Sequence, residues 1–119
     1  MKVGIVSQWY PPEPAYIPDN LATELARRGH RVRVAKLPMD RVARAQETDE
    51  TRGFMKAVVD ARSRLILGAA VLGPEGGEVV SVLQTAMVGK LPYTALRDGM
   101  FAHPTLAESL NNLFMSLSG

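Results

Sequence analysis

The 119-residue chain contains no cysteine, and aromatic residues make up only 6% of it. The absence of cysteine excludes a disulfide framework, thiol chemistry and cysteine-ligated metal. No apolar run approaches the ~18 residues that a membrane-spanning helix needs. With only two histidines and no complete nucleotide-binding motif, we expect neither a metal site nor a bound cofactor.

The remaining composition is that of an ordinary globular protein, with 46% apolar and 22% charged residues. The length predicts a single domain over residues 1–119. The opening MKVGIVSQWYPP has one lysine and no small-residue cleavage site, so it predicts a first strand rather than a secretory signal. We therefore expect a cytoplasmic protein that makes no contact with membranes.

The net charge is only +2, but basic residues crowd an 18-residue stretch. They are Arg27, Arg28, Arg31, Arg33, Lys36, Arg41 and Arg44. A surface that follows a nucleic-acid backbone usually interleaves aromatic residues with the cations, and this stretch has none. A solvated helix end and strand edge explain the charges better, and nucleic-acid binding is the weaker alternative.

The first third of the chain predicts a β–α–β unit. Residues 2–7 form a short β-branched apolar run, and three prolines then make residues 8–17 a loop. A helix follows and ends at Gly29. Residues 31–37 alternate between basic and apolar side chains, which is strand periodicity.

That alternation predicts which side of the second strand is buried. We expect Val32 and Val34 to face the core, with Leu37 as a further candidate. Arg31 and Arg33 are then expected to face solvent.

The middle of the chain predicts a β-hairpin. Its strands are expected at residues 54–60 and 65–72, with the turn at 61–64. A four-residue turn is too short for a parallel crossover, so these two strands must be antiparallel.

Two helices complete the predicted fold, at residues 75–88 and 105–117. The first is apolar nearly all round, which is typical of a helix buried on more than one side. We expect an α+β fold with a largely antiparallel sheet covered by helices on one face. A second subunit could cover the other side of helix 75–88. The predicted interface residues are Val79, Val82, Leu83, Ala86, Met87, Leu110 and Phe114.

The stretch FAHPTLAESL at residues 101–110 permits two interpretations. Thr105 and Glu108 have the spacing of a capping box, in which both side chains serve a helix start. Alternatively, Glu108 lies within reach of one ring nitrogen of His103 and orients that histidine as an acid–base group. The sequence supplies no nucleophile for such a pair, so it could form only half of a site.

Residues of about 34–117 resemble the C-terminal dimerisation domain of the pyridine nucleotide–disulfide oxidoreductases, in particular mercuric reductase-like and dihydrolipoamide dehydrogenase-like members. The motifs that carry the resemblance are RGFMKAVVD, ILGAAVLGPEGGEVV and LPYTALRDGMFAHPT with the following AES. The resemblance implies a domain that supplies most of a homodimer interface. It also implies that His103 and Glu108 match a dyad that reaches into the partner's flavin and disulfide site.

Residues 1–32, MKVGIVSQWYPPEPAYIPDNLATELARRGHRV, resemble instead the N-terminal opening of two-domain retaining glycosyltransferases. This implies a chimera, natural or engineered, of a glycosyltransferase-like β–α segment at 1–33 and a dimerisation-domain-like segment at 34–119. The junction is expected between Gly29 and Lys36.

The resemblances imply a non-catalytic dimerisation module. A flavin domain, redox-active cysteines and a nicotinamide domain, with which the parent family would work, do not occur in this sequence. His103 and Glu108 would then be a vestigial dyad in a chain that is not itself an enzyme. The alternative is a fragment of an oxidoreductase or a glycosyltransferase that needs further domains for activity.

Overall fold

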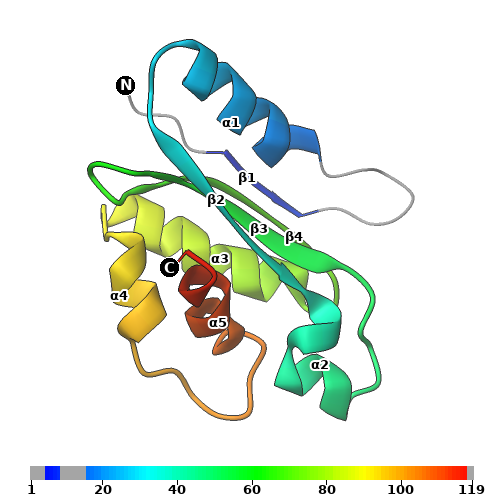
Figure 1. Ribbon diagram of the computed structural model, residues 1–119. Coiled ribbons are helices and arrows are strands. Elements are labelled where there is room, and N and C mark those ends of the chain that lie inside the picture. Colours follow the sequence, from blue (N-terminus) through cyan, green and yellow to red (C-terminus); the bar gives the residue numbers. More distant parts are fainter. Residues whose placement is uncertain (1–4, 9–15, 118–119) are drawn as a thin grey trace.

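The computed structural model describes residues 5–8 and 16–117, with side chains from residue 22 onward. One four-stranded sheet, in the strand order β1-β4-β3-β2, has helices on both faces (Figure 1). In chain order the elements are β1 (Ile5–Gln8), α1 (Tyr16–Arg27), β2 (Val32–Pro38), the 3-10 turn η1 (Met39–Arg41), α2 (Ala43–Glu47), β3 (Phe54–Asp60), β4 (Ile66–Leu72), α3 (Gly76–Val88), α4 (Tyr93–Asp98) and α5 (Ser109–Met115).

The predicted hairpin is confirmed. Strand β3 begins and ends as expected, and β4 begins one residue later than expected. The two strands are antiparallel, with Ala57 opposite Ala69, and β2 pairs antiparallel with β3, with Ala35 opposite Ala57. The sheet is thus largely antiparallel and the fold is α+β, as the sequence predicts.

The β–α–β unit is present in a split form. Strand β1 pairs in parallel with β4, with Val6 opposite Ala69. Because β4, β3 and β2 alternate in direction, β1 and β2 run the same way, yet two strands lie between them. Helix α1 crosses from one edge of the sheet to the other.

The expectation that helices cover only one face is wrong. Helix α1 lies on one face, whereas α3, α4 and α5 lie on the other (Figure 1). Leu25 of α1 forms a small buried cluster with Val58, apart from the main core. The physical reason lies in the hairpin, because Ala57, Val58 and Val59 are all buried, and a strand that is apolar on both faces needs cover on both.

The predicted orientation of β2 is also wrong in part. Ala35 and Leu37 face the main core, whereas Val34 is 42% exposed. Arg33 does not simply face solvent, because its guanidinium donates a hydrogen bond to the Leu117 carbonyl. Helix α1 packs near Val32 and leaves Val34 uncovered, so alternation alone picks the less protected face.

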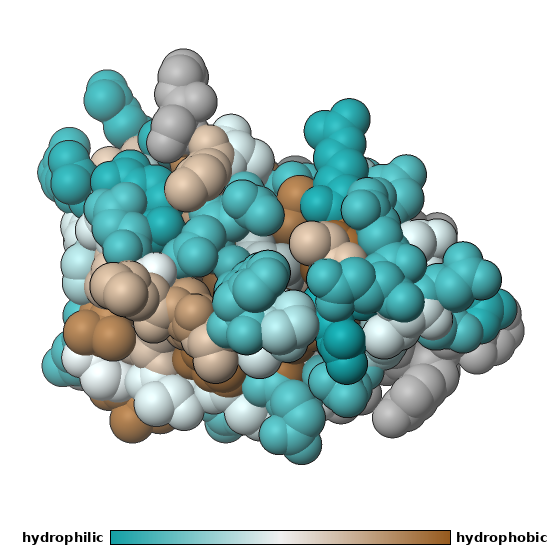
Figure 2. Space-filling view, turned by 90° about the horizontal axis from the view of Figure 1, so that it is seen from below, coloured by the Kyte–Doolittle hydropathy of each residue, from teal (hydrophilic) through white to brown (hydrophobic). Residues whose placement is uncertain are grey.

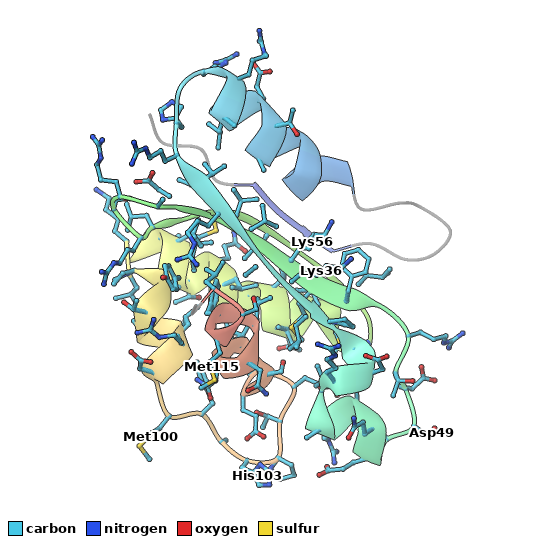
Figure 3. The ribbon with its side chains drawn as sticks, viewed as in Figure 1. Lys36, Asp49, Lys56, Met100, His103 and Met115 are labelled. Atoms are coloured by element: carbon cyan, nitrogen blue, oxygen red, sulfur yellow. The ribbon has the colours of Figure 1, made fainter. Side chains whose placement is uncertain are left out.

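On the α1 face, beyond the cover of the helix, two lysines share one aromatic ring. Lys36 and Lys56 are directly opposite each other on β2 and β3 (Figure 3). Their ammonium nitrogens lie 5.5 and 5.6 Å from the centre of the Phe54 ring. The ring attracts both cations and so offsets part of their mutual repulsion.

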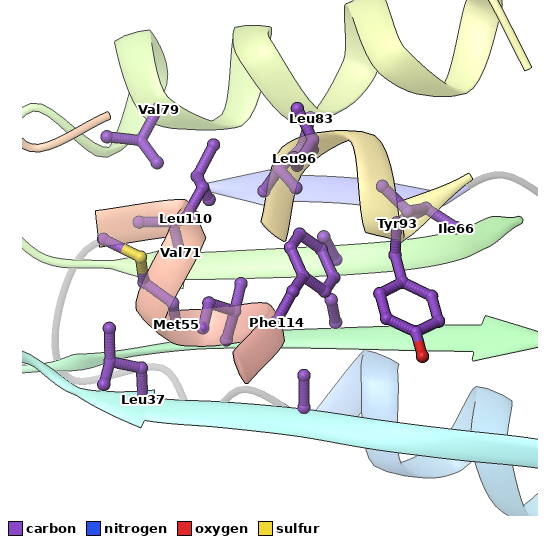
Figure 4. Packing of buried hydrophobic residues seen from close by; sticks show 14 of the residues in the cluster. Leu37, Met55, Ile66, Val71, Val79, Leu83, Tyr93, Leu96, Leu110 and Phe114 are labelled. Carbon is purple, nitrogen blue, oxygen red and sulfur yellow. The ribbon is translucent and has the colours of Figure 1, made fainter. Parts of the chain in front are cut away.

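The main core lies between the sheet and the three C-terminal helices (Figure 4). Phe114 is fully buried at its centre and stacks on Tyr93 of α4, with ring centroids 5.7 Å apart. This stacking joins α5 to α4. The buried residues of α3 and α5 in this core are Val79, Leu83, Ala86, Leu110, Leu113 and Phe114.

We predict a large cost for Gly53→Ala. Gly53 has φ of +108°, and an added Cβ would lie 1.9 Å from the Leu72 carbonyl oxygen, which is backbone. Gly29 supplies the matched control, because it also has positive φ, at +88°, but an added Cβ there meets no atom within 4 Å. We expect Gly29→Ala to cost about 1 kcal/mol and Gly53→Ala about 3 kcal/mol in urea denaturation. Equal costs would show that the β4 backbone moves away without penalty.

We also predict that Asp60 makes stability depend on pH. The hydroxyl and the backbone N–H of Ser63 donate hydrogen bonds to the Asp60 carboxylate and hold its pKa below the usual range. The folded pKa is depressed, so this stabilisation is complete above the unfolded pKa of about 3.9 and is lost as the pH falls through the folded pKa. Because the carboxylate is largely solvated, Asp60→Asn should reduce stability at pH 7 by only about 0.5 kcal/mol. The difference in stability between the unmodified chain and Asp60→Asn should shrink below pH 4. A difference that grows there would contradict the lowered pKa of Asp60.

Candidate functional site

The loop between α4 and α5 brings His103 and Glu108 together. Nδ1 of His103 lies 2.8 and 3.0 Å from the two carboxylate oxygens of Glu108. The His103 side chain is 70% exposed and points away from the body of the protein, whereas Glu108 is 24% exposed (Figure 3). An ionised carboxylate can only accept, so Nδ1 carries a hydrogen and Nε2 is left for another molecule.

The capping interpretation holds for only one of its two halves. The Thr105 hydroxyl accepts the backbone N–H of Glu108 at 3.2 Å and donates to the Ala102 carbonyl at 2.7 Å. The Glu108 carboxylate does not reach back to the helix start, because it pairs with His103. Helix α5 accordingly begins at Ser109 rather than at Thr105.

The pair has the elements of an oriented acid–base group. The carboxylate fixes the ring and its tautomer, and the exposed ring edge is free to exchange a proton with a bound molecule. The sequence supplies no thiol beside it. Within residues 5–8 and 16–117, no group of three or more acidic or histidine side chains could hold a metal ion.

The predicted interface residues divide into two groups. Val82 and Met87 are partly exposed on α3. The other five are buried in this chain's own core, so their side chains leave no surface for a partner: Val79, Leu83, Ala86, Leu110 and Phe114. Helix α3 packs on β4 and β1, and its buried side chains share one core with those of α4 and α5. Sequence periodicity cannot distinguish this burial from a subunit contact.

Four large apolar side chains are exposed near the C-terminal ends of the three core helices. Val88 ends α3, Leu91 lies in the turn after it, Met100 lies after α4, and Met115 ends α5. Met100 is fully exposed and Met115 is 51% exposed. Figure 2 shows apolar side chains gathered on the side where α4 and α5 lie. We use the name apolar surface for the four exposed residues Val88, Leu91, Met100 and Met115. In Figure 3, His103 lies on the same side of the molecule as Met100 and Met115.

The structure separates the basic residues that the sequence crowds together. Arg27 and Arg28 both pair with Glu24 within α1. Arg44 pairs with Glu47 in α2, near the opposite end of β2. These three cations therefore form local ion pairs with neighbouring carboxylates.

Asn111 on α5 also serves the loop. Its side-chain amide donates hydrogen bonds to the Leu96, Arg97 and Gly99 carbonyls. No local sequence pattern predicts these contacts, because the acceptors lie 12 to 15 residues away along the chain. Ser109 is buried, and its hydroxyl contacts the Leu106 carbonyl and the Met55 sulfur.

The half-formed capping box gives a specific prediction. We expect Thr105→Ala to cost about 1 kcal/mol, because the hydroxyl accepts the backbone N–H of Glu108, the residue just before α5. Glu108→Ala should cost less than about 0.5 kcal/mol, because its hydrogen bond to the exposed His103 ring contributes little to stability. Thermal denaturation of both variants tests which costs more stability. A larger loss for Glu108→Ala would indicate that both halves of the capping box form.

Comparison with known proteins places this arrangement in a family. The chain is an α+β domain that carries an exposed His–Glu pair before its last helix. The family "Pyridine nucleotide-disulphide oxidoreductase, dimerisation domain" matches residues 22–114. The chain belongs to this family, and the match begins inside α1, before the junction that the sequence suggested.

Individual relatives agree with this assignment. The chain is 40% identical over 86 residues to the probable pyridine nucleotide-disulfide oxidoreductase RclA of Escherichia coli, covering 72% of this chain and 20% of that protein. It is 36% identical over 83 residues to mercuric reductase of Bacillus cereus, covering 70% of this chain and 13% of the relative. A solved structure of the HOCl-induced flavoprotein disulfide reductase RclA from Escherichia coli superposes with a TM-score of 0.74 and 40% identity, over 81% of this chain and 22% of the other.

These relatives are much longer than this chain, which spans about a fifth of the E. coli protein's length. The matched region is their dimerisation domain. In the described part of the chain, no helix has the length and apolar character that a membrane crossing requires.

Proposed function

We propose that this chain is a dimerisation module of the flavin disulfide reductase type, which associates with a second copy of itself and has no redox turnover of its own. The match of residues 22–114 to the dimerisation domain carries the proposal. The zero cysteine count supports the second part, because a disulfide reductase passes electrons through a pair of thiols. The whole chain, residues 1–119, acts as one domain in this proposal.

The proposed contact with the second copy uses the apolar surface. It retains Val82 and Met87 from the sequence-based set and adds the four exposed residues named above. Exposed apolar side chains at neighbouring helix ends are typical of surfaces that bind another protein. His103 lies beside this surface, so a second copy would bring its ring close to a partner, as the family resemblance implies.

Absence of turnover can be tested directly. Purified chain with added flavin and reduced pyridine nucleotide should oxidise the nucleotide no faster than the flavin alone. His103→Ala is the control, because turnover that depends on His103 would support the alternative, a fragment of an oxidoreductase. We also propose that the chain works in the cytoplasm.

We further propose, on sequence grounds alone, that the first part of the chain derives from a glycosyltransferase-like β–α segment. The supporting string is the opening with its RRGH ending, at residues 1–32. Because the family match begins at residue 22, a junction before that residue fits better than one between Gly29 and Lys36. Residues 9–15 lie outside the described part of the chain. Calorimetry with uridine diphosphate sugars should detect no binding, and tight binding would support the glycosyltransferase alternative.

A further inference from the structure

The loop that carries His103 is tied at its start to the helix that follows it. Nδ2 of Asn111, on α5, lies 2.7 Å from the Leu96 carbonyl oxygen, 2.9 Å from that of Gly99 and 3.2 Å from that of Arg97. All three partners are acceptors, so only the amide NH₂ can face them and the orientation of the side chain is fixed. The two amide hydrogens bond to three carbonyls, so one hydrogen is shared between two carbonyls.

These carbonyls need a donor from elsewhere because α4 ends abruptly. The last carbonyls of a helix have no partner within the helix. Gly99, which follows Asp98, has φ of −67° and ψ of 154°, so the chain leaves α4 in an extended direction without the left-handed turn that often supplies donors. The Asn111 amide takes that role from a neighbouring helix and fixes where the loop departs.

Three polar side chains at three-residue spacing together hold the loop. Thr105 binds the Ala102 carbonyl, Glu108 binds the His103 ring, and Asn111 binds the Gly99 carbonyl. From these contacts we infer that Asn111 is a positioning residue for His103: it fixes the start of the loop so that Nδ1 meets the Glu108 carboxylate and Nε2 faces outward. This inference rests on the proposed placement of His103 beside a second copy, and it adds to the His103–Glu108 pair a residue far from the ring.

The tautomer of His103 reports this positioning directly. In the unmodified chain the Glu108 carboxylate selects the Nδ1–H form of the neutral ring, whereas an unpaired imidazole in water favours Nε2–H. Nitrogen-15 NMR of the imidazole ring distinguishes the two forms. We expect Nδ1–H in the unmodified chain and a shift toward Nε2–H in Asn111→Ala.

Asn112→Ala is the matched control, because Asn112 is the next residue on the same helix and its side chain is exposed. It should leave the tautomer unchanged, and Glu108→Ala should abolish the preference outright. If Glu108→Ala changes the tautomer and Asn111→Ala does not, the inference about Asn111 is wrong while the dyad stands. If the unmodified chain shows Nε2–H, the oriented dyad fails and the inference fails with it.

A measurement on the unmodified chain covers the case in which Asn111→Ala does not fold. The side-chain amide protons of Asn111 should exchange with water about tenfold more slowly than those of Asn112, because three carbonyls hold them. Equal exchange rates for the two side chains would overturn the inference.

Discussion

Phe114→Ala is expected to cost about 3–5 kcal/mol of folding free energy, the range typical for removing a buried aromatic ring. Phe114 is fully buried and stacks on Tyr93, so its removal opens a cavity between α4, α5 and the sheet. A chain of this length has a total stability of about 6–18 kcal/mol, so the variant would lose a large share of it. The midpoint of thermal unfolding should fall by about 10–20 °C.

Met115→Ala is the matched control for this result. Met115 is the next residue on the same helix, but it is 51% exposed and belongs to the apolar surface. Its loss should change the unfolding midpoint of the monomer little. Comparable losses for both variants would contradict the placement of Phe114 at the centre of the core.

Loss of self-association is the second large effect, expected for the double variant Met100→Lys and Met115→Lys. Both side chains are exposed on the apolar surface, so charged replacements leave the protomer's core intact. Buried in a dimer, the two lysine ammonium groups would have no partner, and we expect the dimer Kd to rise by at least about a hundredfold. Sedimentation velocity over a concentration series measures the change.

Val34→Lys separates this effect from a general loss of exposed apolar area. Val34 is also exposed, but it lies on β2, on the face of the sheet that α1 partly covers. A lysine on an edge strand is well tolerated, so this variant should associate as the unmodified chain does. If Val34→Lys dissociates the dimer and the methionine variant does not, the interface lies on the β2 edge instead.

The hairpin and α3 could be predicted from the sequence because their signals are local. Residues 54–72 carry two apolar runs around a short polar turn, and α3 is bounded by glycine-rich stretches. Which helix covers each face of the sheet cannot be predicted from neighbouring residues in the sequence. Before the position of α1 is known, Val34 and Ala35 are equally good candidates for the core. Among the described side chains, those of α1 pack near Val32, and Val34 is 42% exposed.

The candidate site likewise depends on both a local sequence signal and contacts between distant residues. The spacing of His103 and Glu108 permits both a capping box and a pair. The choice depends on the path of the loop after Gly99, which Asn111 fixes through contacts 12 residues away. The buried positions of Leu110 and Phe114 likewise follow from the packing of α4 against α5, so the sequence could not separate them from a subunit contact.

Sedimentation equilibrium at micromolar concentration tests the central proposal most directly. The account predicts a species of twice the 12.9 kDa chain mass, which shifts toward the single mass on dilution and in the Met100→Lys, Met115→Lys variant. A single species of 12.9 kDa at every concentration up to about 100 μM, a range that detects any dimer tighter than about −5 kcal/mol, would contradict self-association by this chain.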